Sequence, residues 1–592
     1  TTMADFPLCD DCREEFTDIT SRRYHAQPIC CNDCGPALTL LDAAGSPMQG
    51  DPILQTQRIL SGNGVVAVKG IGGFHLACIP TPQAVQTLRQ RKHRAAKPLA
   101  LMCRDLKSAR RYCRIDEDMA RLLQSPARPI VLCPKQNIHA WSDLSENSDL
   151  GILLPYAPIH HLLFDGAPFD ALVMTSANAS GLPLIKDNAE ATRLLSGIAD
   201  GFLLHNRDIA YACDDSLAYT LHNAPYFVRR SRGYVPGALC VHDAPDSLLA
   251  FGAQQKATFC LSRNEQAFCG PHIGDLTNIE TLAFFQAHIT HLCALLDIQP
   301  KACVCDLHPD YLSTHAAQEF SQTHDIPLLR VQHHHAHFAA CMADNLLEGD
   351  ALGIVWDGTG LGDDGTIWGG EFLSGNFCTF QRHGSIAPFP LCGGDLAARE
   401  PARAAAGILY AANADIPALF CAGAAFVPQL AANIHCPVAT SVGRLFDGIA
   451  ALTGLNAPNL YSGRAAMRLQ ALAAQSHAPR RYHARLYDTP DGRFCLNTND
   501  MFLQAAQDIA HGAQPCDVAE GFHRYLADGA LLACRRMRQQ TGLSRVLLSG
   551  GVFLNLRLVA LLWQRLTDDG FAVFHHRRVS CSDEGLSLGQ MM

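Results

Sequence analysis

Two histidines and one aspartate in the middle of the chain have the types and spacing of metal ligands. His333 and His337 lie four residues apart, so on a helix both imidazoles face the same side. Asp357 ends an apolar run and is followed by Gly358 and Gly360. We expect Asp357 to lie at the end of a strand, and a carboxylate there, beside glycine backbone N–H groups, can meet a metal ion and a phosphate together. The pattern favours a metal-assisted nucleotide site over solvated histidines at the start of a helix.

A second set of metal ligands lies near the N-terminus. Two Cys-x2-Cys pairs, separated by eighteen residues, have the spacing of a four-thiolate zinc site: Cys9, Cys12, Cys31 and Cys34. Cys30 could replace its neighbour, but Cys31 keeps the two-residue spacing to Cys34. Four thiolates leave no open coordination position, so we expect this zinc to be structural.

Three further segments carry groups that suit a phosphate-bearing ligand. They are Lys92-His-Arg94-Ala-Ala-Lys97, Ser176-Ala-Asn178-Ala-Ser180 and Arg229-Arg230-Ser-Arg232. Each alone is typical of solvated charge or a polar turn. Together they supply cations, hydroxyls and amides after a strand, which is where ligands bind in α/β sheets.

The elements that must position these groups are predicted to form an α/β multidomain chain. We expect a zinc-finger module over 1–48, an α/β domain over 49–240, a linker over 241–246 and a second α/β domain over 248–592. In the middle domain, strands are predicted at 65–69, 99–102, 129–132 and 171–174, and a helix over 82–94.

The second α/β domain is predicted to be duplicated. Apolar pairs at 248–252 and 258–261, and again at 352–356 and 366–372, each resemble two strands joined by a turn. An Ala-rich helical segment covers 396–432. The end of the chain is predicted to return to strand and turn over 546–551 and 586–589.

These motifs, taken together, resemble a known family. The Lys92 and Ser176 segments are similar to YrdC-type domains, which make carbamoyl adenylates from ATP. The His333–Asp357 region, with Gly550-Gly-Val-Phe-Leu-Asn555, resembles the Kae1-like domain of the actin/hexokinase superfamily. A zinc finger followed by these two domains is similar to the HypF carbamoyltransferases of [NiFe]-hydrogenase maturation. Further supporting segments are 69–75, 229–236, 393–396 and 583–590.

The resemblance implies an ATP-dependent reaction. Carbamoyl phosphate or carbamate and ATP would give carbamoyl adenylate, with AMP and pyrophosphate as products. The carbamoyl group would then pass to the C-terminal cysteine of the maturation protein HypE, whose thiocarboxamide is the source of the cyanide ligands. The implied cofactors are structural zinc, ATP with Mg²⁺, and a divalent Zn, Fe or Mg ion in the Kae1-like domain.

The resemblance also assigns residues. Lys92, Arg94, Ser176 and Asn178 would act on the adenylate, and His333 and His337 on carbamoyl transfer. Nucleotide contacts would come from Lys69, Lys97, Arg230, Arg232, Asp357, Gly358, Gly360, Gly550, Gly551 and Asn555, with Gly443-Arg-Leu-Phe-Asp447 a further nucleotide-side segment. The metal ligands would be His333, His337, Asp357 and Asp583.

The chain departs from the family pattern at its start and in one internal segment, among other places. The family begins with an acylphosphatase domain and a first zinc finger, and we expect this chain to lack both. The segment Tyr461-Ser462-Gly-Arg464 has Ser and Arg where the family has acidic or amide residues.

Three other functions are open. A small-molecule O-carbamoyltransferase shares the domain pair, but the cysteine motif favours the hydrogenase branch. Threonylcarbamoyl modification of tRNA is disfavoured by the fusion of both domains and by a net charge of -9, which also argues against nucleic-acid binding. A non-catalytic ATP-binding scaffold is disfavoured by the complete set of metal and phosphate groups.

Composition places the chain among globular proteins. It has 592 residues, 48% of them hydrophobic and 17% charged, with no apolar run long enough to predict a membrane span. The start has no charged segment followed by an apolar one, so no signal peptide is expected. Many of the 25 cysteines lie in strand-like segments, where Cys behaves as a small buried hydrophobe. We therefore expect a cytoplasmic protein with reduced thiols.

Overall fold

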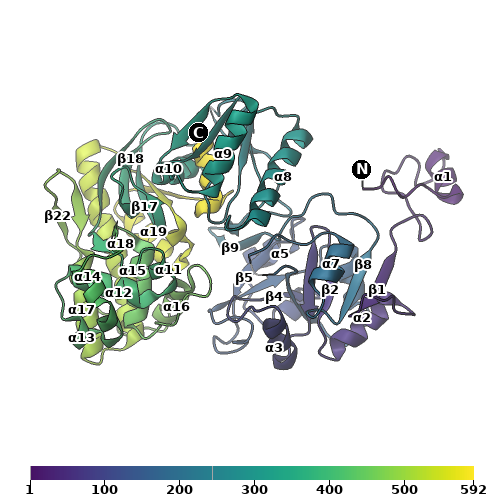
Figure 1. Cartoon of the computed structure of the whole chain (residues 1–592), viewed down its shortest axis with the longest axis horizontal. Coiled ribbons are helices and arrows are strands. Elements are labelled where there is room, and N and C mark those ends of the chain that lie inside the picture. The colour runs from purple at the N-terminus through teal and green to yellow at the C-terminus, as the bar shows by residue number, and fades with distance from the viewer. Residues whose placement is uncertain (1, 180, 243) are drawn as a thin grey trace. The chain divides into compact units, whose positions relative to one another are not determined.

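The computed structural model describes residues 2–179, 181–242 and 244–592 in two compact units (Figure 1). The first unit comprises residues 1–145 and 149–215, and the second comprises 146–148 and 216–592. Ser180, part of the expected phosphate-binding segment, lies outside the described residues. The domain limits 1–48, 49–240 and 248–592 remain predictions.

One mixed sheet forms the centre of the first unit. Its strands are β1 (Leu38–Asp42), β2 (Val66–Lys69), β3 (Phe74–Cys78), β4 (Ala100–Cys103), β5 (Ile130–Pro134), β6 (Asp149–Leu153), β7 (Ala171–Ser176) and β8 (Gly201–His205). Within this unit they hydrogen bond in the order β1-β8-β2-β3-β7-β4-β6-β5. The pairs β2–β8 and β4–β6 are parallel. All four strands predicted for the middle domain are present, with limits shifted by one or two residues.

Helices of the first unit start at capping residues that the sequence supplies. They are α1 (Asp10–Thr17), α2 (Pro52–Ser61), α3 (Pro82–Arg91), α4 (Leu106–Ala109), α5 (Glu117–Gln124), α6 (Pro158–Phe164) and α7 (Asn188–Leu194). Thr81 caps α3 by accepting the N–H of Ala84, and Pro82 is its first residue. The helix ends at Arg91, before the predicted limit of 94, so Lys92 and Arg94 lie beyond its last turn.

The second unit contains two sheets with the same central topology. The first sheet contains β11 (Leu239–Cys240), β12 (Leu248–Ala250), β13 (Cys260–Arg263), β14 (Gln266–Cys269), β15 (Ala302–Asp306) and β16 (Leu328–Val331). The second contains β17 (Ala351–Leu361), β18 (Ile367–Gly375), β19 (Phe380–Ile386), β20 (Phe389–Pro390), β21 (Val438–Ala439), β22 (Leu486–Asp488), β23 (Phe494–Leu496), β24 (Arg545–Ser549) and β25 (Ala572–His575). An antiparallel hairpin, β9 (Leu217–Leu221) and β10 (Ala224–Arg229), precedes both.

The two sheets share their central pattern. The order β14-β13-β12-β15-β16 in the first matches β19-β18-β17-β24-β25 in the second. In each, the middle strand pairs antiparallel with the strand that follows it and parallel with a later strand. This confirms the predicted duplicated α/β fold.

The helices of the second unit flank these sheets. They are α8 (Ile279–Leu296), α9 (Leu312–His324), α10 (His333–Asp344), α11 (Leu396–Arg399), α12 (Pro401–Ala411), α13 (Ile416–Leu419), α14 (Val427–Ala431), α15 (Val442–Leu452), α16 (Arg464–Ala473), α17 (Thr498–Ala510), α18 (Pro515–Thr541), α19 (Leu556–Asp568) and α20 (Leu586–Met591). The described residues also form the 3-10 helices η1 (Cys421–Phe426), η2 (Gly551–Leu554) and η3 (Asp583–Gly585). The predicted helical segment 396–432 is therefore several short helices. Pro401, Pro417 and Pro428 each lie in the first turn of one of them, where proline is tolerated.

The prediction of strand and turn over 586–589 is wrong, because these residues begin helix α20. A short apolar run does not distinguish a buried strand from a buried helix. The helix packs on α10, and a side chain at Gly589 would clash with the Ala336 carbonyl (Figure 1). Close contact between α10 and α20 brings the end of the chain to the helix that carries His333 and His337.

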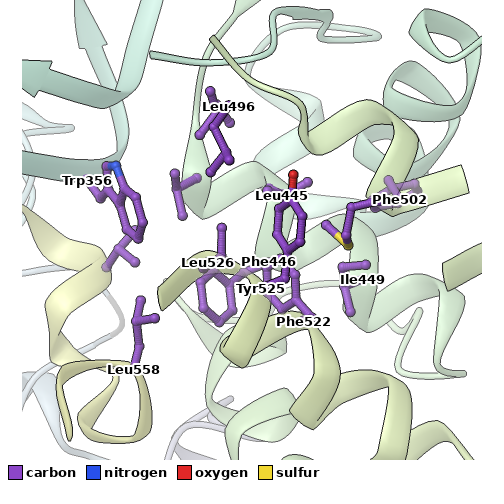
Figure 2. Packing of buried hydrophobic residues seen from close by; sticks show 14 of the residues in the cluster. Trp356, Leu445, Phe446, Ile449, Leu496, Phe502, Phe522, Tyr525, Leu526 and Leu558 are labelled. Atoms are coloured by element: carbon purple, nitrogen blue, oxygen red, sulfur yellow. The ribbon is translucent and has the colours of Figure 1, made fainter. Parts of the chain in front are cut away.

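A large apolar core lies beside β17 and anchors the residue before Asp357. Figure 2 shows Trp356 facing a cluster that includes Leu526 and Leu558. The Trp356 side chain is fully buried and stacks on Phe553, with ring centroids 5.8 Å apart. Truncation of such a residue to alanine typically costs about 3–5 kcal/mol. The backbone at Asp357 is therefore held by the core on one side.

Helix α8 is the one helix in the described part of the chain with the length and mean hydropathy of a membrane-spanning segment. Its Phe285, Ile289 and Leu292 side chains belong to the buried core of the first sheet of the second unit. These three apolar residues thus pack within the unit, whereas Ile279 and Leu295 of the same helix are exposed.

Candidate functional site

Four predicted metal ligands meet in the second unit. Their ligand atoms all lie within 4.8 Å of one another, and we call His333, His337, Asp357 and Asp583 the His/Asp quartet. Nε2 of His337 lies 3.3 Å from Oδ2 of Asp357 and 3.7 Å from Oδ1 of Asp583. Nε2 of His333 lies 3.6 Å from the same Asp357 oxygen. All four residues are at most 8% exposed.

Separate elements supply the members of the quartet. Helix α10 places His333 and His337 on one face, and Gln332 caps it by accepting the N–H of His335. Asp357 does not end a strand as predicted, since β17 continues to Leu361 through an irregular register after Trp356. This irregularity turns the Asp357 carboxylate toward α10.

Glycine is required where the backbone of β17 approaches α10. A Cβ atom at Gly360 would lie 2.6 Å from the rings of both His333 and His334. Gly551 donates its N–H to Oδ1 of Asp357 at 3.1 Å, and Gly550 has a φ of +104°, which favours glycine. The predicted glycines Gly360, Gly550 and Gly551 therefore shape the backbone around Asp357.

The buried charges of the quartet stabilise one another. Burial opposes ionisation of Asp357, but His333 and His337 hold the pKa of its carboxyl well below the usual range. Burial likewise opposes protonation of the two imidazoles. Asp306 nevertheless raises the pKa of His333, and Asp357 and Asp583 raise that of His337. Such a set of two imidazoles and two carboxylates matches the donors that bind zinc, iron or magnesium.

Asp306, which the sequence analysis missed, orients His333. Its Oδ2 lies 2.7 Å from Nδ1 of His333, and the carboxylate is fully buried at the end of β15. With Nδ1 bound to Asp306, His333 presents Nε2 to the quartet, and this buried atom has no hydrogen-bond partner in the described structure. A carboxylate behind a metal-binding imidazole is the usual outer partner of such a ligand. The residues present therefore fit a metal ion.

Two cationic side chains border the quartet. Burial opposes the charge of Lys256, yet Asp583 and Asp357 raise its pKa, so its ammonium lies in their field. Arg444 lies near Gly358, where an added Cβ would be 3.7 Å from its Nη2. Its partner, Asp447, lies 3.0 Å away and is itself buried, which raises the pKa of that carboxyl. These cations are suited to a phosphate beside the quartet.

The predicted adenylate-forming residues of the first unit also meet. Lys92 lies 3.4 Å from both Oγ1 of Thr175 and Oδ1 of Asn178, and it donates to the carbonyl of Ser176. Arg94 donates to Thr175 at 3.2 Å. We call these five residues the Lys92 cluster. Burial, with Arg94 and Lys97 nearby, lowers the pKa of Lys92 to about 7. A buried, weakly protonated lysine is prepared to bind an anion that restores its charge.

A buried dyad beside the Lys92 cluster was missed by sequence reasoning. Nε2 of His75 lies 3.2 Å from Oδ2 of Asp215. On the paired strands β3 and β7, His75 stands opposite Ser176. His75 lies in the segment 69–75 that supports the family resemblance, but nothing in its local spacing indicated a partner 140 positions away.

Other residues that were predicted to contact the nucleotide make hydrogen bonds to groups of the protein itself. Lys69 donates to the carbonyls of His205 and Arg207, and burial lowers its pKa. Asn555 caps α19 and lies 3.0 Å from Nε2 of His523. Arg230 donates to the carbonyls of Tyr234 and Gly237, and its backbone N–H donates to Glu584.

Three remaining residues of the prediction are placed as follows. Arg232 is buried in the second unit, where its carbonyl accepts from Ser216. Lys97 is exposed in the first unit. In the divergent segment, Arg464 begins α16 and donates to the carbonyl of Pro458.

The four predicted thiols near the N-terminus form one group. Sγ of Cys31 lies 3.6 Å from that of Cys9 and 3.8 Å from that of Cys34. Zinc–sulfur bonds of about 2.3 Å in a tetrahedron separate sulfurs by about 3.8 Å, so the spacing fits zinc. Backbone N–H groups of Cys31 and Cys9 lower the pKa of Cys34 to about 6, which favours a thiolate. Cys30 is exposed and is not among the four.

Comparisons with known proteins cover nearly the whole chain. Four family models match in order, described as HypF finger (8–41), Telomere recombination of the Sua5/YciO/YrdC type (58–231), HypF Kae1-like domain (243–344) and Carbamoyltransferase, Kae1-like domain, second subdomain (353–590).

Several named proteins are similar to this chain over its full length. The chain is 41% identical to a carbamoyltransferase HypF of Rhodobacter capsulatus and 34% identical to a probable carbamoyltransferase HypF of Methanocaldococcus jannaschii. These matches cover 100% of the chain and 79% and 85% of the two relatives. A crystal structure of full-length HypF in the phosphate- and nucleotide-bound form is 36% identical, with a TM-score of 0.93, and the match covers 100% of this chain and 78% of that one.

Proposed function

The chain belongs to the HypF family of carbamoyltransferases, and we propose that it makes carbamoyl adenylate and transfers the carbamoyl group to a protein thiol. The family places this enzyme in hydrogenase maturation. The observation that carries the proposal is that two chemically different groups of residues assemble in two units. The Lys92 cluster suits an anionic nucleotide, and the His/Asp quartet suits a metal ion.

The first step is adenylation. A carbamate oxygen attacks the α-phosphorus of ATP bound with Mg²⁺, and pyrophosphate leaves. Lys92 and Arg94 offset the negative charge that develops on the phosphates, and bound phosphate favours the charged form of Lys92. Ser176 and Asn178 supply hydroxyl and amide groups for the carbamoyl end or a phosphate oxygen. His75, held by Asp215, is placed to orient the substrate beside Ser176.

The second step is carbamoyl transfer. A cysteine thiolate attacks the carbamoyl carbon, and AMP leaves with the bonding electron pair. A divalent ion held by the His/Asp quartet would polarise the carbamoyl oxygen or neutralise the adenylate phosphate. Arg444 and Lys256 supply positive charge beside that phosphate. Burial of the quartet excludes water, which would otherwise hydrolyse the adenylate.

The acceptor proposed for this step is the C-terminal cysteine of a HypE-type maturation protein. The zinc finger, with its four clustered thiols, favours the hydrogenase branch over the small-molecule branch. We assign its zinc a structural role. None of the 25 cysteines of the chain forms a disulfide, which fits a reducing cytoplasm.

ATP–pyrophosphate exchange tests the adenylation step, with carbamate and carbamoyl phosphate supplied separately. We expect exchange with carbamate, because the Lys92 cluster holds the groups needed for that substrate. No exchange with either substrate would contradict the proposal. The comparison between the two substrates shows whether this chain itself hydrolyses carbamoyl phosphate.

The acceptor is tested by offering a peptide that ends in cysteine and a sugar hydroxyl in parallel. Carbamoylation of the peptide supports the proposed function. Carbamoylation of the sugar alone would identify a small-molecule O-carbamoyltransferase.

A further inference from the structure

A buried Ser–His–Asp chain lies next to the His/Asp quartet and takes no part in either proposed step. Oγ of Ser549 lies 2.8 Å from Nε2 of His576, and Nδ1 of His576 lies 3.6 Å from Oδ2 of Asp344. The three residues are 0%, 1% and 3% exposed. Ser549 is the last residue of β24 and His576 follows the neighbouring parallel strand β25, so the sheet itself sets them side by side.

The residue types are those of a serine hydrolase, but the hydrogen bonds are not. Ser549 donates its hydroxyl proton to the backbone carbonyl of His337 at 2.7 Å. A serine has one hydroxyl proton, so Nε2 of His576 must donate to Ser549 and is not the base that would activate it. With all three side chains buried, a substrate does not reach the hydroxyl. The chain is therefore a structural connection and not a nucleophile.

Both ends of this connection lead to metal ligands. At one end, Ser549 holds the carbonyl of His337, a member of the quartet. At the other end, Asp344 is the last residue of α10, the helix that carries both histidines. Its carboxylate accepts the backbone N–H groups of Arg577 at 2.6 Å and Arg578 at 3.0 Å.

The segment that Asp344 fixes leads directly to the fourth quartet residue. His576 to Val579 precede Asp583 by only a few residues, and no helix or strand intervenes. Ser549 is followed by Gly550 and by Gly551, whose N–H donates to Asp357. The three residues thus join the three parts of the chain that position His337, Asp357 and Asp583.

The electrostatics of Asp344 agree with this role. Burial opposes its ionisation, but His576 and the N–H groups of Arg577 and Arg578 hold the pKa of its carboxyl below the usual value. An ionised, fully hydrogen-bonded carboxylate at the end of α10 fixes the position of that helix against the 576–579 segment.

We propose that Ser549, His576 and Asp344 are positioning residues that set the geometry of the metal centre. The inference rests on the proposed metal site and extends it to residues that do not touch the metal. Partners bonded to the ligating side chains themselves typically change metal affinity by about 10–100-fold, and Ser549 bonds to the backbone of one ligand residue. Removing the Ser549 hydroxyl breaks the hydrogen bond that ties α10 at His337 to the end of β24, and lets the His337 imidazole shift relative to Asp357.

The test is a Co²⁺ titration of intact protein whose cysteine site already holds zinc. Visible absorption of bound Co²⁺ reports both affinity and coordination geometry. We expect Ser549→Ala to weaken Co²⁺ binding about tenfold or more and to change the spectrum, and Ser549→Thr, which keeps a hydroxyl, to restore both. Ser313→Ala is the matched control, because Ser313 is equally buried on α9 and its hydroxyl has no hydrogen-bond partner among the described residues. ATP–pyrophosphate exchange should be unchanged in all three variants.

The outcomes separate this inference from the proposed metal site. Wild-type affinity and spectrum in Ser549→Ala would overturn the positioning role alone. No Co²⁺ binding by wild-type protein, or binding that survives His333→Ala, would overturn the metal site and the inference with it. If Ser549→Ala does not fold, His576→Gln provides the same measurement, because glutamine keeps a donor toward Ser549 and loses the nitrogen that faces Asp344.

Discussion

Nδ1 of His333 lies 2.7 Å from Oδ2 of Asp306, and both side chains are almost completely buried. This contact fixes the ring of His333 and leaves Nε2 for the quartet. Asp306 is therefore predicted to control metal affinity without binding the metal.

Asp306→Asn tests this relationship. Asparagine keeps the shape of the side chain but loses the charge that favours a proton on Nδ1. We expect affinity for the quartet metal to fall by about 10–100-fold. The measurement is a metal-competition titration, with Asp310→Asn, an exposed change on the loop that follows Asp306, as the control. Equal affinity in the two variants would refute the role of Asp306.

The lowered pKa of Lys92 predicts that the affinity for nucleotide depends on pH. Burial lowers its pKa to about 7, so the ammonium of the free protein loses its proton as the pH rises through 7. ATP favours the charged form. Its affinity should therefore be highest below pH 7 and fall by about tenfold per pH unit above it. At pH 8, binding should take up a proton, which calorimetry detects in buffers of different ionisation enthalpy.

Lys92→Met should remove both the affinity and the proton uptake. Lys107→Met, which changes an exposed lysine of the same unit, is the control and should leave both intact. Proton uptake that persists in Lys92→Met would assign the titration to another group.

The geometry of the four-thiol group predicts that replacing Cys31 and replacing its neighbour Cys30 have different effects on zinc binding. Cys31→Ser should abolish bound zinc at the N-terminal module, since Sγ of Cys31 lies within 3.8 Å of two other ligand sulfurs. Cys30→Ser should retain it, because Cys30 is exposed and outside the group. Zinc content by metal analysis checks both variants. Loss of zinc from Cys30→Ser alone would reverse the ligand assignment.

The sequence predicted those groups whose spacing is local or follows a regular element. His333 and His337 are one helical turn apart, and the two Cys-x2-Cys pairs close a tetrahedron by their own geometry. The duplicated sheet was also predictable, because its apolar strand pairs recur along the chain.

Partners that meet only through tertiary structure were not predictable in the same way. Asp306 ends β15 just as an aspartate was expected to end β17, but nothing local indicated that it faces a helix 27 residues later. The amide of Asn555 caps a helix, which its local sequence does not reveal. Residues 586–589 form part of helix α20 and not a strand, and a short buried apolar run is compatible with either element.

The central claim is that adenylation and carbamoyl transfer use different residues, and His337→Ala tests it most directly. Two rates are measured on the same preparation: ATP–pyrophosphate exchange with carbamate, and carbamoylation of a cysteine-terminated acceptor. The claim predicts exchange near the wild-type rate, because the Lys92 cluster is intact, and transfer reduced to background, because the quartet has lost a ligand. Loss of both rates together in a folded, zinc-containing variant would contradict it.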